Sequence, residues 1–256
     1  MASVITIPAV GDNYIYLYRY GRNNTLVVDP GDAGAVFDTL EKYSLNLTHA
    51  LATHHHFDHV GGIKELKRKT GCEIIGSDKN RISIIDRVVK DKDVIEISGT
   101  RILVIATPGH TSGSVCYFVE PSKKYSGILF TGDTLFIGGC GRPIECDASI
   151  MWDSLQKIAL LPDDTLVYPG HDYTEENYQF ALTIEPNNDL VKKSLQAIKK
   201  RQKLCKPTVP SNIGQEKASN VFLRADDPEI KVALDMPKTT AVEVFAELRK
   251  RKNIFG

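Results

Sequence analysis

The sequence lacks a charge excess of either sign, because its 32 lysines and arginines balance its 32 aspartates and glutamates. It also lacks an apolar run of about 18 or more residues, which a membrane-spanning helix requires. Proteins that bind nucleic acid or anionic membranes through charge carry a basic excess. We therefore expect neither nucleic acid nor a membrane as a partner, and a small molecule instead.

Signs of secretion are missing as well. Residues 1–4 (Met-Ala-Ser-Val) lack the basic start and the long apolar run of a signal peptide, so we expect a cytoplasmic location. The five cysteines are odd in number and scattered, without a CxxC pair, which argues against a disulfide framework or a zinc knuckle. Cys140 and Cys146 lie in or beside a glycine-rich loop, and we expect them to be small buried thiols.

The order of elements indicates two parts. In the first two thirds, short β-branched runs alternate with turns and helical patterns, which predicts a layered α/β domain. From Thr174 onward, long helical patterns predict a smaller helical domain, in which residues 206–220 form a loop. The expected strands are residues 4–7, 14–18, 25–28, 47–53, 73–75, 101–106, 114–119, 127–131 and 165–168, and the expected helices are 33–44, 150–160, 175–184, 190–204 and 241–252.

A dense cluster of polar residues follows the strand at 47–53. Five residues of metal-ligand type occupy six positions there, namely His54, His55, His56, Asp58 and His59. Imidazole nitrogens and carboxylates are what a borderline divalent cation such as Zn²⁺ binds. Without a metal, several polar rings would compete for partners, so the spacing predicts a metal site.

Three more strands each run into a turn that carries a ligand-type residue: His110, Asp133 and His171. Ligands at the carboxyl ends of strands in one sheet can converge although they are far apart in sequence. We predict two ions, about 3.5–4 Å apart as in other two-metal sites, with Asp133 as the bridge. One ion takes His54, His56 and His110, and the other takes Asp58, His59 and His171.

Other catalytic patterns fit less well. His55 and His59 have the spacing of a zincin helix, but the intervening glutamate is missing and the preceding run is typical of a strand. We therefore expect that His55 is not a ligand. Residues 109–113 do not match the G-x-S-x-G nucleophile pattern. The loop 138–141 lacks the full G-x-G-x-x-G phosphate motif, so we interpret it as a place of close backbone approach.

The pattern H-x-H-x-D-H followed by His110, Asp133 and His171 resembles the metallo-β-lactamase superfamily over about residues 1–173. This resemblance implies an αββα sandwich with a binuclear site at one edge. True β-lactamases lack an aspartate at the position of Asp133, so the resemblance favours the hydrolases of the superfamily.

Within the superfamily the chain is most similar to glyoxalase II, the hydroxyacylglutathione hydrolases, almost to its C-terminus. The matching segments are residues 12–14, 139–142, 171–174, 220–224 and 248–255. The resemblance implies a catalytic domain at 1–173 and a substrate-binding domain at 174–256. Carried over by position, the glutathione-binding residues are Arg142, Tyr173, Arg249 and Lys252. Without the resemblance, the basic run 249–252 would be interpreted as a solvated face favoured by the helix dipole. Ile144 replaces the family's usual aromatic residue.

The implied activity is hydrolysis of S-2-hydroxyacylglutathione, such as S-D-lactoylglutathione, in methylglyoxal detoxification. Asp58 and Asp133 then hold the ions and orient the attacking water. Asp29 is a candidate acceptor for a ligand histidine. We expect a monomer and two Zn²⁺ ions, although iron and manganese suit the same donors. The alternatives are a mononuclear iron persulfide dioxygenase, a metallo-hydrolase of another thioester, a lactone or a nucleic acid, and a metal-binding module without activity.

Overall fold

The structure is a computed structural model that describes residues 3–9, 11–123 and 125–255. Met1 and Ala2, which belong to the segment judged to lack the features of a signal peptide, lie outside the described residues. The chain divides into two compact units. The first unit comprises residues 1–106 and 113–132, and the second comprises residues 107–112 and 133–256. Along the described chain, no helix combines the length and the apolar character that a membrane crossing needs.

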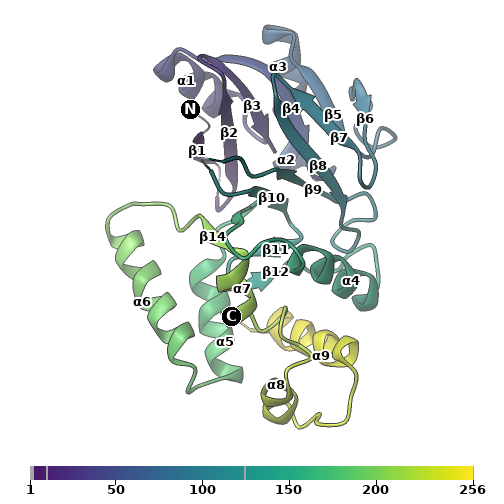
Figure 1. Cartoon of the computed structure of the whole chain (residues 1–256), viewed down its shortest axis with the longest axis vertical. Coiled ribbons are helices and arrows are strands. Elements are labelled where there is room, and N and C mark those ends of the chain that lie inside the picture. The colour runs from purple at the N-terminus through teal and green to yellow at the C-terminus, as the bar shows by residue number, and fades with distance from the viewer. Residues whose placement is uncertain (1–2, 10, 124, 256) are drawn as a thin grey trace. The chain divides into compact units, whose positions relative to one another are not determined.

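A mixed six-stranded sheet with helices on one face forms half of the first unit (Figure 1). β1 to β3 are antiparallel, and β3 to β6 run parallel. Val36 and Leu40 on α1 and Ile63 and Leu66 on α3 are buried in one core with the inward-facing strand residues. The elements are β1 (Ser3–Pro8), β2 (Tyr14–Tyr20), β3 (Asn24–Val28), α1 (Ala33–Tyr43), β4 (Asn46–Ala52), α2 (Phe57–Val60), α3 (Ile63–Thr70), β5 (Glu73–Gly76) and β6 (Arg87–Val88).

An antiparallel sheet completes the first unit. Its strands are β7 (Val94–Ile97), β8 (Thr100–Ala106), β9 (Val115–Val119) and β10 (Ile128–Gly132). The rings of Tyr16 and Phe130 lie 5.6 Å apart between the sheets, and the Tyr117 hydroxyl donates to the Ala52 carbonyl at 2.9 Å. Both faces of this sheet are covered at β9 and β10, where every residue is buried.

The second unit is mainly helical. α5 and α6 run side by side (Figure 1), and α4 packs on α9 through Trp152 and Phe245, whose ring centroids lie 5.9 Å apart. Thr240 and Glu243 form a capping box that starts α9. The elements are β11 (Leu135–Phe136), β12 (Gly139–Cys140), α4 (Ala148–Ala159), β13 (Leu166–Pro169), α5 (Thr174–Ile184), α6 (Asp189–Lys203), β14 (Ser211–Asn212), α7 (Ile213–Ser219), α8 (Pro228–Ala233) and α9 (Ala241–Asn253).

The expected α/β class and the expected strands and helices are confirmed, with ends that differ by a few residues. The prediction of a loop over 206–220 is wrong, because β14 and α7 occupy residues 211–219. Asn212 starts α7, since its side chain accepts the Gln215 N–H at 2.8 Å. Both prolines of the segment precede this cap and therefore do not interrupt the helix.

Candidate metal centre and substrate cavity

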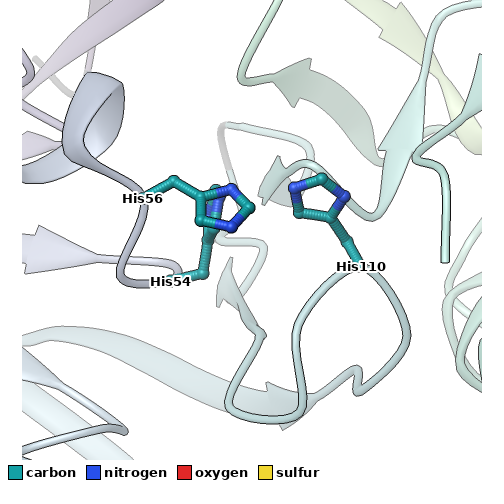
Figure 2. Close-up of side chains that lie close together, drawn as sticks. All are labelled: His54, His56 and His110. Carbon is teal, nitrogen blue, oxygen red and sulfur yellow. The ribbon is translucent and has the colours of Figure 1, made fainter. Parts of the chain in front are cut away.

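In the first unit, the histidine cluster lies where β4 ends and α2 begins. The ring of His54 lies 4.6 Å from that of His56 and 4.2 Å from that of His59, between centroids. Figure 2 shows the rings of His54 and His56, which leave the same short segment of chain. His54 and His59 are each only 1% exposed. The imidazole nitrogens of His54 and His59 are therefore shielded from bulk water, whereas His56 is half-buried.

The Asp29 carboxylate contacts two residues of this segment, Thr53 and His59. One oxygen of its carboxylate accepts the Thr53 N–H at 2.8 Å, and the other accepts the Thr53 hydroxyl at 2.7 Å and lies 3.0 Å from His59 Nδ1. Donor atoms of Asp29, His54 and His59 lie within 4.8 Å of one another. Because Nδ1 of His59 donates to Asp29, its Nε2 is left as the ligand atom. The acceptor role expected for Asp29 is thus present.

Asp58 and His55 have different surroundings. Asp58 Oδ2 lies 3.2 Å from His59 Nε2 and accepts the Asn13 side-chain amide at 3.0 Å. A Cβ at Gly31 would lie 1.8 Å from the Asp58 carbonyl oxygen, so this backbone approach requires glycine. His55 instead contacts the Arg81 guanidinium, 3.2 Å from each ring nitrogen. That contact supports the prediction that His55 is not a ligand.

The second unit gathers the other predicted ligands. Asp133 Oδ2 lies 3.3 Å from His110 Nε2 and 3.3 Å from His171 Nε2. His110 Nδ1 donates to the Arg142 carbonyl at 2.9 Å, which directs its Nε2 toward Asp133. Figure 2 labels the His110 ring at the tip of its loop. Tyr173 stacks on His171 with ring centroids 5.0 Å apart. One carboxylate oxygen therefore lies between two buried imidazoles, as a bridging ligand would.

A cavity of about 270 Å³ opens in the second unit beside His110 and Asp133. All four residues expected to bind glutathione line it. The full lining is His110, Asp133, Phe136, Cys140, Gly141, Arg142, Ile144, Tyr173, Glu176, Asn177, Arg249, Lys252 and Asn253. A site of this size with convergent cationic groups suits a small ligand that carries carboxylates.

The basic run at the end of α9 does not form one solvated face. Arg249 is 9% exposed and donates to the Cys140 carbonyl at 3.0 Å, and the Lys252 side chain is 10% exposed and pairs with Glu176. By contrast, the side chain of Lys250 is 79% exposed. The solvated-face alternative is therefore wrong for Arg249 and Lys252. The dipole of α9 alone does not account for them, because both lie in a cavity wall.

Sequence reasoning missed two cavity residues on α5. Glu176 pairs with Lys252, and the Asn177 side-chain amide donates to the Ile137 carbonyl at 3.1 Å. Both lie about one helical turn after Tyr173, and this i+3 and i+4 spacing from a predicted site residue was the signal that could have identified them. Ile144 lies in the cavity wall with 54% exposure.

The cysteines of the loop show no sign of a nucleophilic role. Burial raises the pKa of the Cys140 thiol to about 11, and burial also raises the pKa of Cys146. A thiol is a nucleophile only as its thiolate, so both residues stay unreactive near neutral pH. The interpretation of Cys140 as a small buried side chain is confirmed, but the same expectation for Cys146 is wrong, because Cys146 is only half-buried.

Two family models match the chain: the metallo-β-lactamase superfamily over residues 8–171 and the hydroxyacylglutathione hydrolase C-terminus over residues 172–255. Hydroxyacylglutathione hydrolase from Methylococcus capsulatus is 42% identical, covering 100% of this chain and 99% of that protein. The enzyme of the same name from Chromohalobacter salexigens is 45% identical and covers 100% of both. Among solved structures, ETHE1 from Myxococcus xanthus is 25% identical with a TM-score of 0.68, over 99% of this chain and 92% of that one.

Proposed function

Since this chain belongs to the hydroxyacylglutathione hydrolase family of the metallo-β-lactamase superfamily, we propose that it hydrolyses S-2-hydroxyacylglutathiones to glutathione and a 2-hydroxy acid. The chain is a thioester hydrolase, and S-D-lactoylglutathione is the expected substrate. One observation carries this proposal most directly: the cavity that contains His110 and Asp133 also contains Arg142, Arg249 and Lys252. Hydrolytic chemistry and recognition of carboxylates are therefore combined in one cavity.

The superfamily implies bound divalent metal, and the residues present fit it. Imidazole nitrogens and carboxylate oxygens are the ligand atoms that such ions bind. In the first unit, His59 Nε2 lies 3.2 Å from an Asp58 oxygen. In the second unit, an Asp133 oxygen lies 3.3 Å from the Nε2 atoms of His110 and His171. His54, His56 and His110 would hold one ion, Asp58, His59 and His171 would hold the other, and Asp133 would be shared by both. We propose Zn²⁺ at both positions.

Each residue has a distinct task in this scheme. Bound there, two divalent cations would supply Lewis acidity and would lower the pKa of water from about 15.7 to about 7. Asp58 and Asp133 orient the attacking water as acceptors of its hydrogen bonds. Asp29 and the Arg142 carbonyl fix the rings of His59 and His110, so that these ligands need no rearrangement during the reaction.

The thiol carrier is held by the cationic wall of the cavity. Glutathione carries two carboxylates, and Arg142, Arg249 and Lys252 can pair with them. Tyr173 is fixed between Phe136 and His171, at ring-centroid distances of 5.2 Å and 5.0 Å, so its hydroxyl is a positioned hydrogen-bond group beside a ligand. Binding energy from the carrier can then place the thioester at the ligands.

The test is absorbance-monitored hydrolysis of S-D-lactoylglutathione by purified protein. The control substrate is the same acyl group on N-acetylcysteamine, which has no carboxylate. We expect a kcat/KM at least about a hundredfold higher for the glutathione thioester, since two ion pairs to the carrier contribute about 1.5 kcal/mol or more each. No hydrolysis of either substrate would refute the proposed activity. Equal hydrolysis of both would refute the recognition of glutathione.

Several predictions accompany this proposal. We propose that residues 1–173 form the catalytic domain and residues 174–256 the substrate-binding domain. We also propose a monomer in the cytoplasm without a nucleic-acid or membrane partner. Light scattering on a size-exclusion column should give a mass near 28.4 kDa, and a mass of twice that value or more would contradict the monomer.

A further inference from the structure

A short loop forms part of the cavity wall, and hydrogen bonds from side chains outside the loop fix its conformation. The 136–142 loop (Phe136 to Arg142) contributes Phe136, Cys140, Gly141 and Arg142 to the cavity. Its carbonyl groups are held by side-chain amides and a guanidinium from three separate places in the second unit. These contacts are Asn177 to Ile137 at 3.1 Å, Asn220 to Gly139 at 2.9 Å, and Arg249 to Cys140 at 3.0 Å.

At its tip the loop has no room for a side chain. Gly138 adopts a positive φ of 68°, and a Cβ there would lie 2.9 Å from the Tyr178 ring. The loop therefore packs its backbone directly on α5. Its conformation depends on the hydrogen bonds that reach this backbone rather than on side chains of its own.

Glu216 on α7 is the acceptor at the centre of this arrangement. Its side chain is completely buried, and Oε2 accepts the Gly138 N–H at 2.8 Å and the Asn220 amide at 3.0 Å. Oε1 accepts the Ser211 hydroxyl at 2.6 Å. Within the described residues, no lysine, arginine or histidine forms an ion pair with Glu216. Its charge is therefore stabilised by three neutral donors, two of which belong to the loop or hold it.

Because Glu216 is buried, its carboxyl gains or loses its proton near neutral pH. Burial raises the pKa of Glu216 to about 7, against the hydrogen bonds from Ser211, Gly138 and Asn220, which lower it. The titratable group that faces it is Tyr178 on α5, whose pKa is raised by its burial and by the Glu216 charge. Tyr178 therefore stays neutral over the working range, and Glu216 changes charge within that range.

We propose that Glu216 is a positioning residue whose ionised carboxylate fixes the 136–142 loop in the form that binds the thiol carrier of the substrate. This rests on the proposed function. A hydrogen bond to an ionised acceptor is roughly twice as strong as a neutral one, so ionisation tightens the loop through Gly138 and Asn220. When Glu216 is protonated, its hydroxyl donates to Ser211, whose own hydroxyl reverses its role, and the other two bonds become neutral.

The cost of this arrangement supports a functional role. A buried charge without a cation destabilises a fold, and residues that do so tend to serve activity. Glutamine at position 216 would keep an acceptor for Gly138 and a donor for Ser211, and would imitate the protonated form at every pH. The effect on substrate binding therefore comes from the charge of Glu216 and not from the presence of its side chain.

The experiment compares KM and kcat for S-D-lactoylglutathione between about pH 5.5 and about pH 8.5 in the metal-loaded protein. For the wild type we expect KM to rise about three- to tenfold as the pH falls through 7, as the strength of the loop contacts falls. Glu216→Gln should show the higher KM across the whole range, with kcat changed by no more than about twofold. Ser211→Ala should move the midpoint to higher pH, because the Ser211 hydrogen bond lowers the pKa of Glu216.

The matched control is Glu185→Gln. Glu185 is a mostly buried carboxylate of the second unit, with a side chain 10% exposed, but it pairs with Arg224 and does not line the cavity. It should leave the pH profile of KM unchanged. A wild-type-like profile in Glu216→Gln, an unmoved midpoint in Ser211→Ala, or a flattened profile in the control would overturn the inference. An active wild type with constant KM would overturn it alone, whereas an inactive wild type would also overturn the proposed function.

Discussion

Replacing Glu216 by glutamine should stabilise the protein at alkaline pH and not at acid pH. Folding raises the pKa of this carboxyl from 4.5 to about 7, since burial disfavours its charged form. The folded protein then binds the proton more tightly than the unfolded chain does. The stability that comes from the protonated carboxyl is complete below about pH 4.5 and is lost as the pH rises through about 7.

The size of the effect follows from the same interval. At about 1.36 kcal/mol for each pH unit, the interval from 4.5 to about 7 corresponds to ~3 kcal/mol in the free energy of unfolding. Glutamine carries no charge and escapes this cost. The gain of Glu216→Gln over the wild type should therefore be about 2–3 kcal/mol larger at pH 8.5 than at pH 5, where the wild-type carboxyl is mostly protonated.

The assay is urea denaturation of both proteins at the two pH values, followed by circular dichroism. Effects of pH on other groups and on bound metal are shared by the two proteins and cancel in the difference between them. A gain that is the same at both pH values would refute the reasoning, and so would a variant that is less stable at pH 8.5. Either result would mean that Glu216 is not a buried, titrating carboxyl.

Three further predictions test the site, two of them with a matched control variant. Asp133→Ala should lose most bound metal and nearly all activity, whereas His55→Ala should keep both. Elemental analysis measures the metal content, and hydrolysis of the thioester measures the activity. Equal losses in the two variants would refute the ligand assignment. Lys252→Ala should raise KM about tenfold without loss of metal, because an ion pair to the carrier contributes about 1.4 kcal/mol, while the exposed Lys250→Ala should match the wild type. Ile144→Tyr should lower KM by up to about tenfold, since an added hydroxyl can bind the carrier; a raised KM would mean that the loop selects another thiol.

The strands were the part of this protein that its sequence predicted best, and the candidate metal ligands were found from the residues that follow those strands. The run after β4 concentrates five ligand-type side chains within six positions, and such a density has few structural explanations. The contact of Asp29 with His59 also follows from position, because Asp29 directly follows β3 and His59 lies in α2, which begins five residues after the neighbouring strand β4 ends. Local spacing was enough in these cases, since the chemistry depends on residues at strand ends.

Long-range burial was not predictable in the same way. Arg249 and Lys250 are adjacent basic residues, but only Arg249 is buried, because its guanidinium lies 5.0 Å over the Phe222 ring and reaches Cys140. Glu216 lies in a polar segment that was expected to be a loop, and its hydrogen-bond donors come from positions 138, 211 and 220. These contacts join residues far apart in the sequence, and the spacing of apolar residues does not indicate them. A sequence therefore cannot distinguish these side chains from solvated ones.

The central claim, a two-metal hydrolase of glutathione thioesters, is tested most directly by titrating Zn²⁺ into metal-free protein while hydrolysis of S-D-lactoylglutathione is measured. Because Asp133 lies beside a proposed ligand of each position and would be a ligand shared by both ions, we expect activity to rise up to about two equivalents per chain and then to remain constant. Full activity at one equivalent, or activity without added metal, would contradict the claim.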